Sequence, residues 1–251
     1  MSDLEVRRDG AVLSLVLARP AKRNALSLPL IEALHDALAA AELEAEVRVV
    51  TLSGAGPDFC AGADLQELLA SADREPAENE RDALRLGSLL ARLRAFPRPV
   101  VAIVHGRALA GGAGLATACD IVVAAESSRF GYPEMERGFV PAMVMTLLRR
   151  LAGEKAAFEL VATGRVVDAL EAHALGLVTR VVPDERLQAE AGELVARLAS
   201  ASPSAMHLTK KLFYELDGRS FEEGIALGAR VNALARTTPD FRAAIARFLA
   251  K

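Results

Sequence analysis

The chain has 251 residues, of which 52% are hydrophobic and 25% charged, and its formal net charge is −3. This length and hydrophobic content fit one large domain with a substantial core. The small net charge argues against a nucleic-acid partner or an anionic membrane surface. The polar first ten residues lack the apolar core of a signal peptide, and no apolar stretch is long enough to span a membrane. We therefore expect a cytoplasmic protein.

The cysteines and histidines give no sign of a metal site. Cys60 and Cys119 lie in apolar sequence, which predicts two buried thiols rather than a disulfide. The four histidines are scattered along the chain without ligand spacing. We expect no metal ion in this protein.

The N-terminal quarter of the chain predicts two strands, a helix and a third strand. Residues 4–18 alternate apolar and polar side chains around an Asp-Gly pair, which predicts a β-hairpin. Residues 28–44 have helical spacing, with Ser27 as a candidate N-cap. The β-branched residues of 47–54 predict a buried strand that ends at a glycine.

The middle of the chain alternates strands and helices. A helix should begin at Asp64, and the polar residues 71–80 predict a mobile loop. A helix over 81–95 is stopped by two prolines, and a buried strand follows over 100–106. A glycine-rich turn, a short apolar helix and another strand come next.

The C-terminal part of the chain is predominantly helical. After a short strand within 177–183, we expect helices over 184–199, 203–217 and 220–249, the last broken near Thr238. The sequence therefore predicts an α/β core over 1–180 and a helical region over 185–251. The apolar stripes of these helices need a partner surface, in this chain or in a neighbouring subunit.

The segment "GRALAGGAGLATACD", residues 106–120, is the most informative motif. It is not a phosphate loop of the Walker type, because no Lys-Ser/Thr pair follows its last glycine. It is a poor dinucleotide fingerprint, because Thr117 stands where the third glycine belongs. Its glycines can instead expose the first N–H groups of a helix to an oxyanion, or simply permit close packing.

A second strand-to-helix turn favours the oxyanion interpretation. The segment "GPDFCAGADL", residues 56–65, has small residues immediately before Asp64, a candidate N-cap. One amide from each turn could converge on a single oxygen atom.

Four segments at this spacing carry a family resemblance. They are "RPAKRNALS" (19–27), "FCAGADL" (59–65), "VVAIVHGRALAGGAGLATACDIVVA" (100–124) and "FGYPEMERGFVP" (130–141). Together they resemble the crotonase (enoyl-CoA hydratase/isomerase) superfamily over nearly the whole chain. The resemblance implies an acyl-CoA substrate and an α/β fold, a crotonase-like superhelix of β-β-α repeats with a C-terminal α-helical trimerisation region. It also implies homotrimers, or hexamers formed by two trimers, and no cofactor apart from the coenzyme A of the substrate.

The resemblance also implies roles for individual residues. The thioester oxygen would lie between the backbone N–H groups of Ala63 and Gly111, and Glu134 of the "PE" segment would be the acid–base residue. Typical hydratases carry another glutamate in the helix after the glycines, and Gly114 stands at that position here.

Further residues would line the substrate site. The "FCAGADL" motif places Ala61, Asp64 and Leu65 beside the substrate, and Lys22 and Arg23 are candidates for the nucleotide end of coenzyme A.

A single carboxylate leaves the reaction open. Glu134 could activate water for hydration and deliver the proton from that same water, or it could move a proton between two carbons in a Δ3,Δ2-enoyl-CoA isomerisation. We favour hydration, with isomerisation as the alternative and a non-catalytic acyl-CoA-binding relative as a third possibility. The acyl group cannot be chosen from the sequence.

Overall fold

The computed structural model describes residues 2–250. Its largest element is a six-stranded sheet in the order β1-β2-β3-β4-β6-β9. The strands are β1 (Leu4–Asp9), β2 (Val12–Leu17), β3 (Val49–Gly54), β4 (Val100–Val104), β6 (Ile121–Ala125) and β9 (Arg180–Val182). The pair β1–β2 is the predicted antiparallel hairpin, and the pairs from β2 to β9 are parallel.

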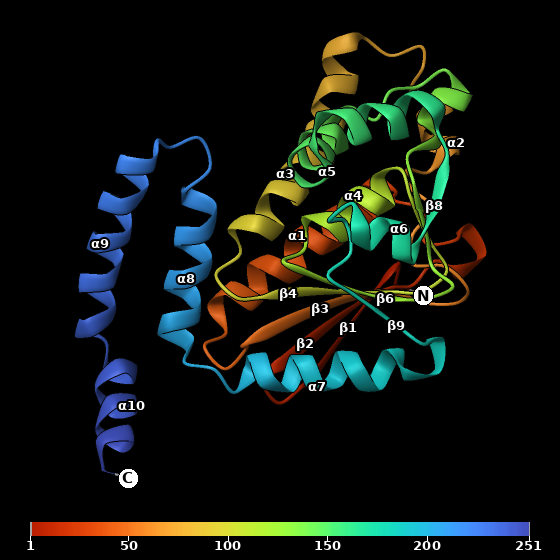
Figure 1. Ribbon diagram of the computed structural model, residues 1–251. Coiled ribbons are helices and arrows are strands. Elements are labelled where there is room, and N and C mark those ends of the chain that lie inside the picture. Colours follow the sequence, from red (N-terminus) through yellow and green to blue (C-terminus); the bar gives the residue numbers. More distant parts are fainter. Residues whose placement is uncertain (1, 251) are drawn as a thin grey trace.

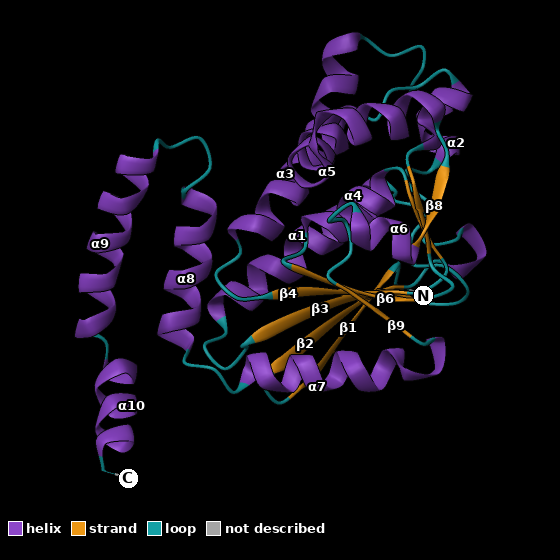
Figure 2. Cartoon of the chain, in the orientation of Figure 1, coloured by secondary structure: helices purple, strands orange, loops and turns teal. Residues whose placement is uncertain are grey.

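A second, three-stranded sheet has the order β5-β7-β8. Its strands are β5 (Arg107–Leu109), β7 (Arg129–Gly131) and β8 (Val166–Asp168), with β5 parallel to β7. Figure 2 shows this small sheet at one end of the larger sheet, with β8 running in a different direction. Because β5 directly follows β4, and β7 follows β6, the chain passes from the large sheet into the small one twice.

Helices cover both faces of the large sheet (Figure 1). On one face lie α1 (Leu28–Leu43), α3 (Pro76–Ala95), α4 (Gly111–Ala118), α5 (Ala142–Thr163) and α6 (Ala169–Ala174), and on the other lies α7 (Leu187–Ala199). The short α2 (Leu65–Ala70) and the 3-10 helices η1 (Pro20–Lys22), η2 (Pro133–Arg137) and η3 (Asp184–Arg186) lie in the connections. The remaining helices, α8 (Pro203–Glu215), α9 (Phe221–Thr237) and α10 (Pro239–Leu249), extend to one side.

The strands alternate between two hydrophobic cores, as expected for a sheet covered on both faces. In β4, Val100, Ala102 and Val104 belong to the larger core beneath α1, α3 and α4. Val101 and Ile103 point the other way and join the core that α7 completes. The larger core positions α4, which carries the glycine-rich segment.

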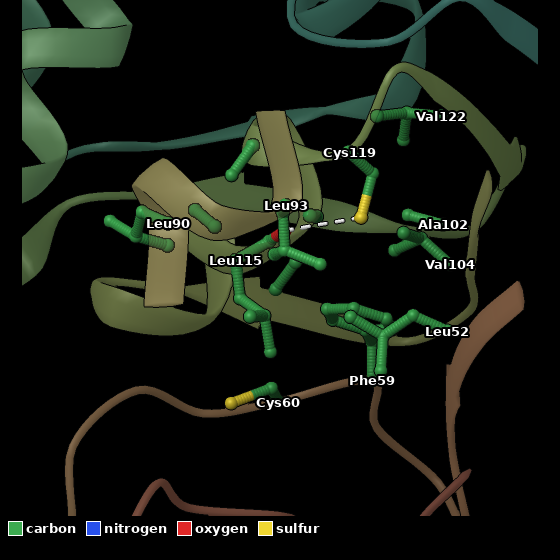
Figure 3. Packing of buried hydrophobic residues seen from close by; sticks show 14 of the residues in the cluster. Leu52, Phe59, Cys60, Leu90, Leu93, Ala102, Val104, Leu115, Cys119 and Val122 are labelled. Carbon is green, nitrogen blue, oxygen red and sulfur yellow. Dashed lines mark hydrogen bonds between the residues drawn. The ribbon is translucent and has the colours of Figure 1, made fainter. Parts of the chain in front are cut away.

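Both cysteines are buried and free, as predicted. Figure 3 shows them in the larger core, where the Cys119 thiol donates a hydrogen bond to the Leu115 carbonyl oxygen. Burial raises the pKa of Cys60 to about 12 and also raises the pKa of Cys119. Both thiols therefore stay protonated at neutral pH and act as small apolar side chains.

One predicted boundary was wrong and one was confirmed. Helix α3 begins at Pro76, so residues 76–80 are helical and not part of the predicted loop. Proline has the backbone angle of a first helical residue, and Glu78 lies favourably at the positive end of the helix. The predicted break near Thr238 is confirmed, because Thr238 ends α9 and caps α10 through its hydroxyl.

Candidate functional site

Three chain segments lie side by side where the two strand-to-helix turns meet. The Leu109 N–H donates to the Cys60 carbonyl oxygen at 3.0 Å, and the Ala110 N–H donates to the Gly131 carbonyl oxygen at 2.8 Å. Residue 60 is bridged to Ala108 in parallel, and β5 is parallel to β7. The residues that follow each segment therefore emerge at one edge. These are Ala63, the start of α4 and the start of η2.

The Ala63 N–H is fixed in position but donates to no acceptor among residues 2–250. The Leu26 N–H donates to the Gly62 carbonyl oxygen at 2.7 Å, and the Asp64 N–H donates to the Leu26 carbonyl oxygen at 2.9 Å. These two bonds fix the peptides on either side of Ala63. Among the hydrogen bonds of residues 2–250, none uses the Ala63 N–H.

The Gly111 N–H is the first amide of α4 and also has no acceptor within residues 2–250. Ala110 precedes it with φ 52° and ψ −125°, a conformation that side chains rarely adopt. A Cβ atom on Gly111 would lie 3.9 Å from the Ala63 nitrogen. Gly111 and Ala63, whose amides the family resemblance pairs, thus lie close together at the N-terminus of α4, which is the positive end of this helix.

Asp64 supports this arrangement from the side. Its carboxylate caps α2 by accepting from the Gln66 N–H at 3.0 Å, and it accepts from Arg19 Nη2 at 3.0 Å. Burial alone would raise the pKa of Asp64, but the hydrogen bonds from Arg19 and Gln66 hold it below its ordinary value. Asp64 is therefore a charged anchor of the turn that carries Ala63.

Glu134 lies in η2, which begins with Pro133 and ends at Gly138 in a left-handed conformation. Its side chain is buried, and Oε2 has no hydrogen-bond partner among the described residues. Burial raises the pKa of Glu134 above its ordinary value, although its own N–H and Arg137 oppose the shift. A buried carboxylate with a raised pKa and a free oxygen has the character of an acid–base group.

The other glycines of the segment serve packing. A Cβ atom on Gly112 would lie 2.3 Å from the Cys60 carbonyl oxygen, so glycine lets α4 approach this segment. A Cβ atom on Gly114 would lie 2.2 Å from Val144 Cγ1. Close packing therefore explains Gly112 and Gly114, whereas Gly111 is the glycine whose N–H has no acceptor among residues 2–250.

The candidate coenzyme A contacts lie outside this turn. Lys22 Nζ donates to Gln66 Oε1 at 2.7 Å on the surface, and Arg23 has an exposed side chain. The Ala61 N–H donates to the Arg23 carbonyl oxygen, which connects these basic residues to the turn that carries Ala63. Leu65 is exposed at the start of α2.

Sequence reasoning missed several residues that build the site. Asn24 is buried with a positive φ and donates to the carbonyl oxygens of Ala55 and Asp58. The Asp58 carboxylate binds Arg107 at 2.9 Å and so ties the two turns together. Arg19 and Asn24 fall within the recognised motif, which was the available signal. No sequence signal pointed to the contact between Val144 and Gly114, because these residues lie in different segments of the chain.

Comparisons with known proteins agree on one family. Residues 7–251 match the profile of the family described as enoyl-CoA hydratase/isomerase. A protein of Thermus thermophilus, named as a candidate enoyl-CoA hydratase, is 44% identical over 242 residues, 96% of each chain. The 2,3-dehydroadipyl-CoA hydratase of Escherichia coli (strain K12) is 36% identical and covers 100% of this chain and 97% of its own. The crystal structure of an enoyl-CoA hydratase from Mycobacterium smegmatis aligns with a TM-score of 0.95 at 33% identity, over 99% of this chain and 96% of that one.

Proposed function

Because the chain belongs to the enoyl-CoA hydratase/isomerase family, we propose that it hydrates a 2-enoyl-CoA thioester with Glu134 as the only acid–base residue. It is an enzyme of the hydratase or isomerase type, with the crotonase-like α/β fold of its structural relatives. The observation that carries the proposal is a buried carboxylate with one unpartnered oxygen, in a segment that emerges at the same edge as two amides without acceptors.

The two amides would stabilise the charge that develops on the thioester oxygen. The N–H groups of Ala63 and Gly111 would donate to this oxygen as the enolate forms. Each such donor contributes about 3–4 kcal/mol of transition-state stabilisation in comparable sites. The apolar surroundings of α4, in which Ala113, Leu115 and Ala116 are buried, strengthen the interaction because water is excluded.

Glu134 would carry the proton in both halves of the hydration. Its ionised carboxylate takes a proton from water while the water oxygen forms a bond to the β-carbon. The electron pair of the double bond moves to the thioester oxygen and gives the enolate. The enolate then collapses, and the α-carbon takes the proton that Glu134 holds. The carboxylate returns to its starting state, and one water has been added.

Isomerisation is the second candidate, because one carboxylate also suffices for it. Glu134 would take a proton from C2 of a 3-enoyl-CoA and return it to C4, through the same enolate. Gly114, which supplies no side chain beside the site, is the observation that favours this reaction.

The two reactions give opposite signals in one assay. Hydration of a 2-enoyl-CoA removes the absorbance of the conjugated thioester, whereas isomerisation of a 3-enoyl-CoA creates it. We expect hydration, seen as loss of absorbance, to be faster than isomerisation when short, long and branched acyl chains are tested in parallel. A protein that creates conjugation and does not hydrate is an isomerase, which would overturn the proposal.

Binding of coenzyme A and oligomer formation belong to the same proposal. Lys22 and Arg23, near the turn that carries Ala63, would bind the anionic nucleotide end, and no further cofactor is needed. Helices α9 and α10 have no buried residue. Their large exposed apolar side chains, which support a homotrimer or a pair of trimers, are Phe221, Ile225, Leu234, Phe241, Ile245, Phe248 and Leu249.

The mass in solution tests the oligomer. Light scattering should give the mass of three chains or six, and the mass of a single chain would contradict the proposed oligomer.

Within residues 2–250, no helix has both the length and the apolar character to cross a membrane.

A further inference from the structure

Gly114 on α4 and Val144 on α5 fit closely against each other beside the proposed site. A Cβ atom on Gly114 would lie 2.2 Å from Val144 Cγ1 and 3.1 Å from Val144 Cβ. Separations below 3.0 Å do not occur between non-bonded carbons in folded proteins, so any side chain at 114 requires Val144 to move. Val144 itself is buried at 3% exposure and belongs to the larger core.

Gly114 lies on the face of α4 that carries the proposed oxyanion amide. It follows Gly111 by three residues, so the two positions share a side of the helix. Both face α3, because Cβ atoms on Gly111 and Gly114 would contact Leu86 and Leu90 respectively. A side chain at 114 would therefore begin next to the proposed site, in the volume that Val144 occupies.

Neither partner can move away easily. Valine is branched at Cβ and has one strongly preferred rotamer in a helix, so Val144 cannot rotate aside without strain. Helix α4 cannot retreat toward the core, because Gly112 already contacts the Cys60 backbone. Leu90 lies on the remaining side. The overlap would have to be relieved by displacing α5.

We propose that Val144 determines how many carboxylates this site can hold, because it fills the space that a second one at position 114 would need. This inference rests on the proposed function. The chain does not merely lack a glutamate at 114, since its packing excludes one. A second carboxylate at position 114 would therefore require substitutions at both 114 and 144. A glutamate at 114 alone would overlap Val144 and destabilise the fold.

The steric part of the proposal is tested by thermal denaturation, which does not depend on any substrate. Gly114→Ala should lower the melting temperature in the native chain. In the Val144→Gly background the same substitution should raise it, by about 2–4 °C, because alanine is the better helix former. Gly192→Ala in α7, where nothing lies within 4 Å of the added Cβ, is the matched control and should raise it equally in both backgrounds. If Gly114→Ala changes the melting temperature in the same direction in both backgrounds, the steric claim is wrong.

The functional part is tested by comparing Val144→Gly with the double variant Gly114→Glu, Val144→Gly. The ratio of 2-enoyl-CoA hydration to 3-enoyl-CoA isomerisation should rise by about tenfold or more in the double variant, a fraction of the about 10²–10⁴-fold that a well-placed acid–base group contributes. An unchanged ratio, despite the reversal in the thermal test, overturns the role of Val144 in setting the carboxylate number. If the native chain turns over neither substrate, the proposed function fails, and the thermal test still decides the steric claim.

Discussion

Replacing Glu134 by glutamine should inactivate the protein and stabilise it at the same time. The substitution keeps the size of the side chain and removes its charge and its basicity. Glu134 is 8% exposed, and its Oε2 has no partner among the described residues. Loss of a general base typically costs about 10²–10⁴-fold in rate. Loss of this buried charge should stabilise the fold, because burial raises the pKa of Glu134 and so disfavours its ionised form.

The sign of the stability effect follows from the raised pKa of Glu134. A carboxyl group whose pKa is higher in the folded state binds its proton more tightly there, so the fold loses stability as pH rises from the ordinary value of 4.5 through the folded pKa. The glutamine variant escapes this loss. At neutral pH its melting temperature should exceed that of the native protein.

Calorimetry and the hydration assay, run on the same preparations, test this prediction. The gain in melting temperature should shrink as the pH is lowered and vanish below 4.5, where the native carboxyl group is protonated in both the folded and the unfolded state. If the variant is inactive and also less stable at neutral pH, Glu134 has a structural role and the reasoning is refuted.

Three further predictions concern the site and its support. The kcat/KM for hydration should fall as the pH is lowered through a single pKa above 4.5, because Glu134 must be ionised; a profile without this acidic limb contradicts the assignment. Gly62→Ala places a Cβ atom 2.8 Å from the Ala110 methyl group at φ +101°, so it should cost about 1–3 kcal/mol of unfolding free energy and lower the hydration rate, whereas Gly192→Ala should do neither. Lys210→Met leaves Asp120, its partly exposed partner at 2.7 Å, without a counter-charge, and chemical denaturation should show a loss of about 3–5 kcal/mol; a loss below about 1 kcal/mol would contradict this.

The parts of the fold that could be predicted were those encoded locally. The hairpin depends on alternation and an Asp-Gly turn, and β4 on a run of β-branched residues. The break at Thr238 depends on a threonine cap followed by proline. The start of α3 was misplaced, because the polar composition of 76–80 outweighed the signal from Pro76 at the first helical position.

The glycine segment shows where sequence reasoning about the site reaches its limit. The pattern suggested two uses of the glycines, close packing and an exposed amide, and the structure distributes these two features over different positions. Gly111 has an unused amide beside Ala63, whereas Gly112 and Gly114 allow contacts with Cys60 and Val144. Which glycine has which use depends on segments that are distant in the sequence, so no local pattern could assign them.

The supporting residues were missed for the same reason. Asp58 and Arg107 are separated by 49 positions, and Arg19 and Asp64 by 45. In the sequence, these four residues are charged side chains with no visible relation to one another. The fold brings each pair into contact. Only the structure reveals that the Asp58–Arg107 pair holds the two strand-to-helix turns together and that the Arg19–Asp64 pair anchors the turn that carries Ala63.

A structure of the Glu134→Gln variant with a bound 2-enoyl-CoA tests the central claim most directly. The account predicts that the thioester oxygen lies about 3 Å from both the Ala63 nitrogen and the Gly111 nitrogen. The side chain at 134 should face the reacting carbons. A thioester oxygen bound elsewhere, with the two amides still unused, would contradict the account.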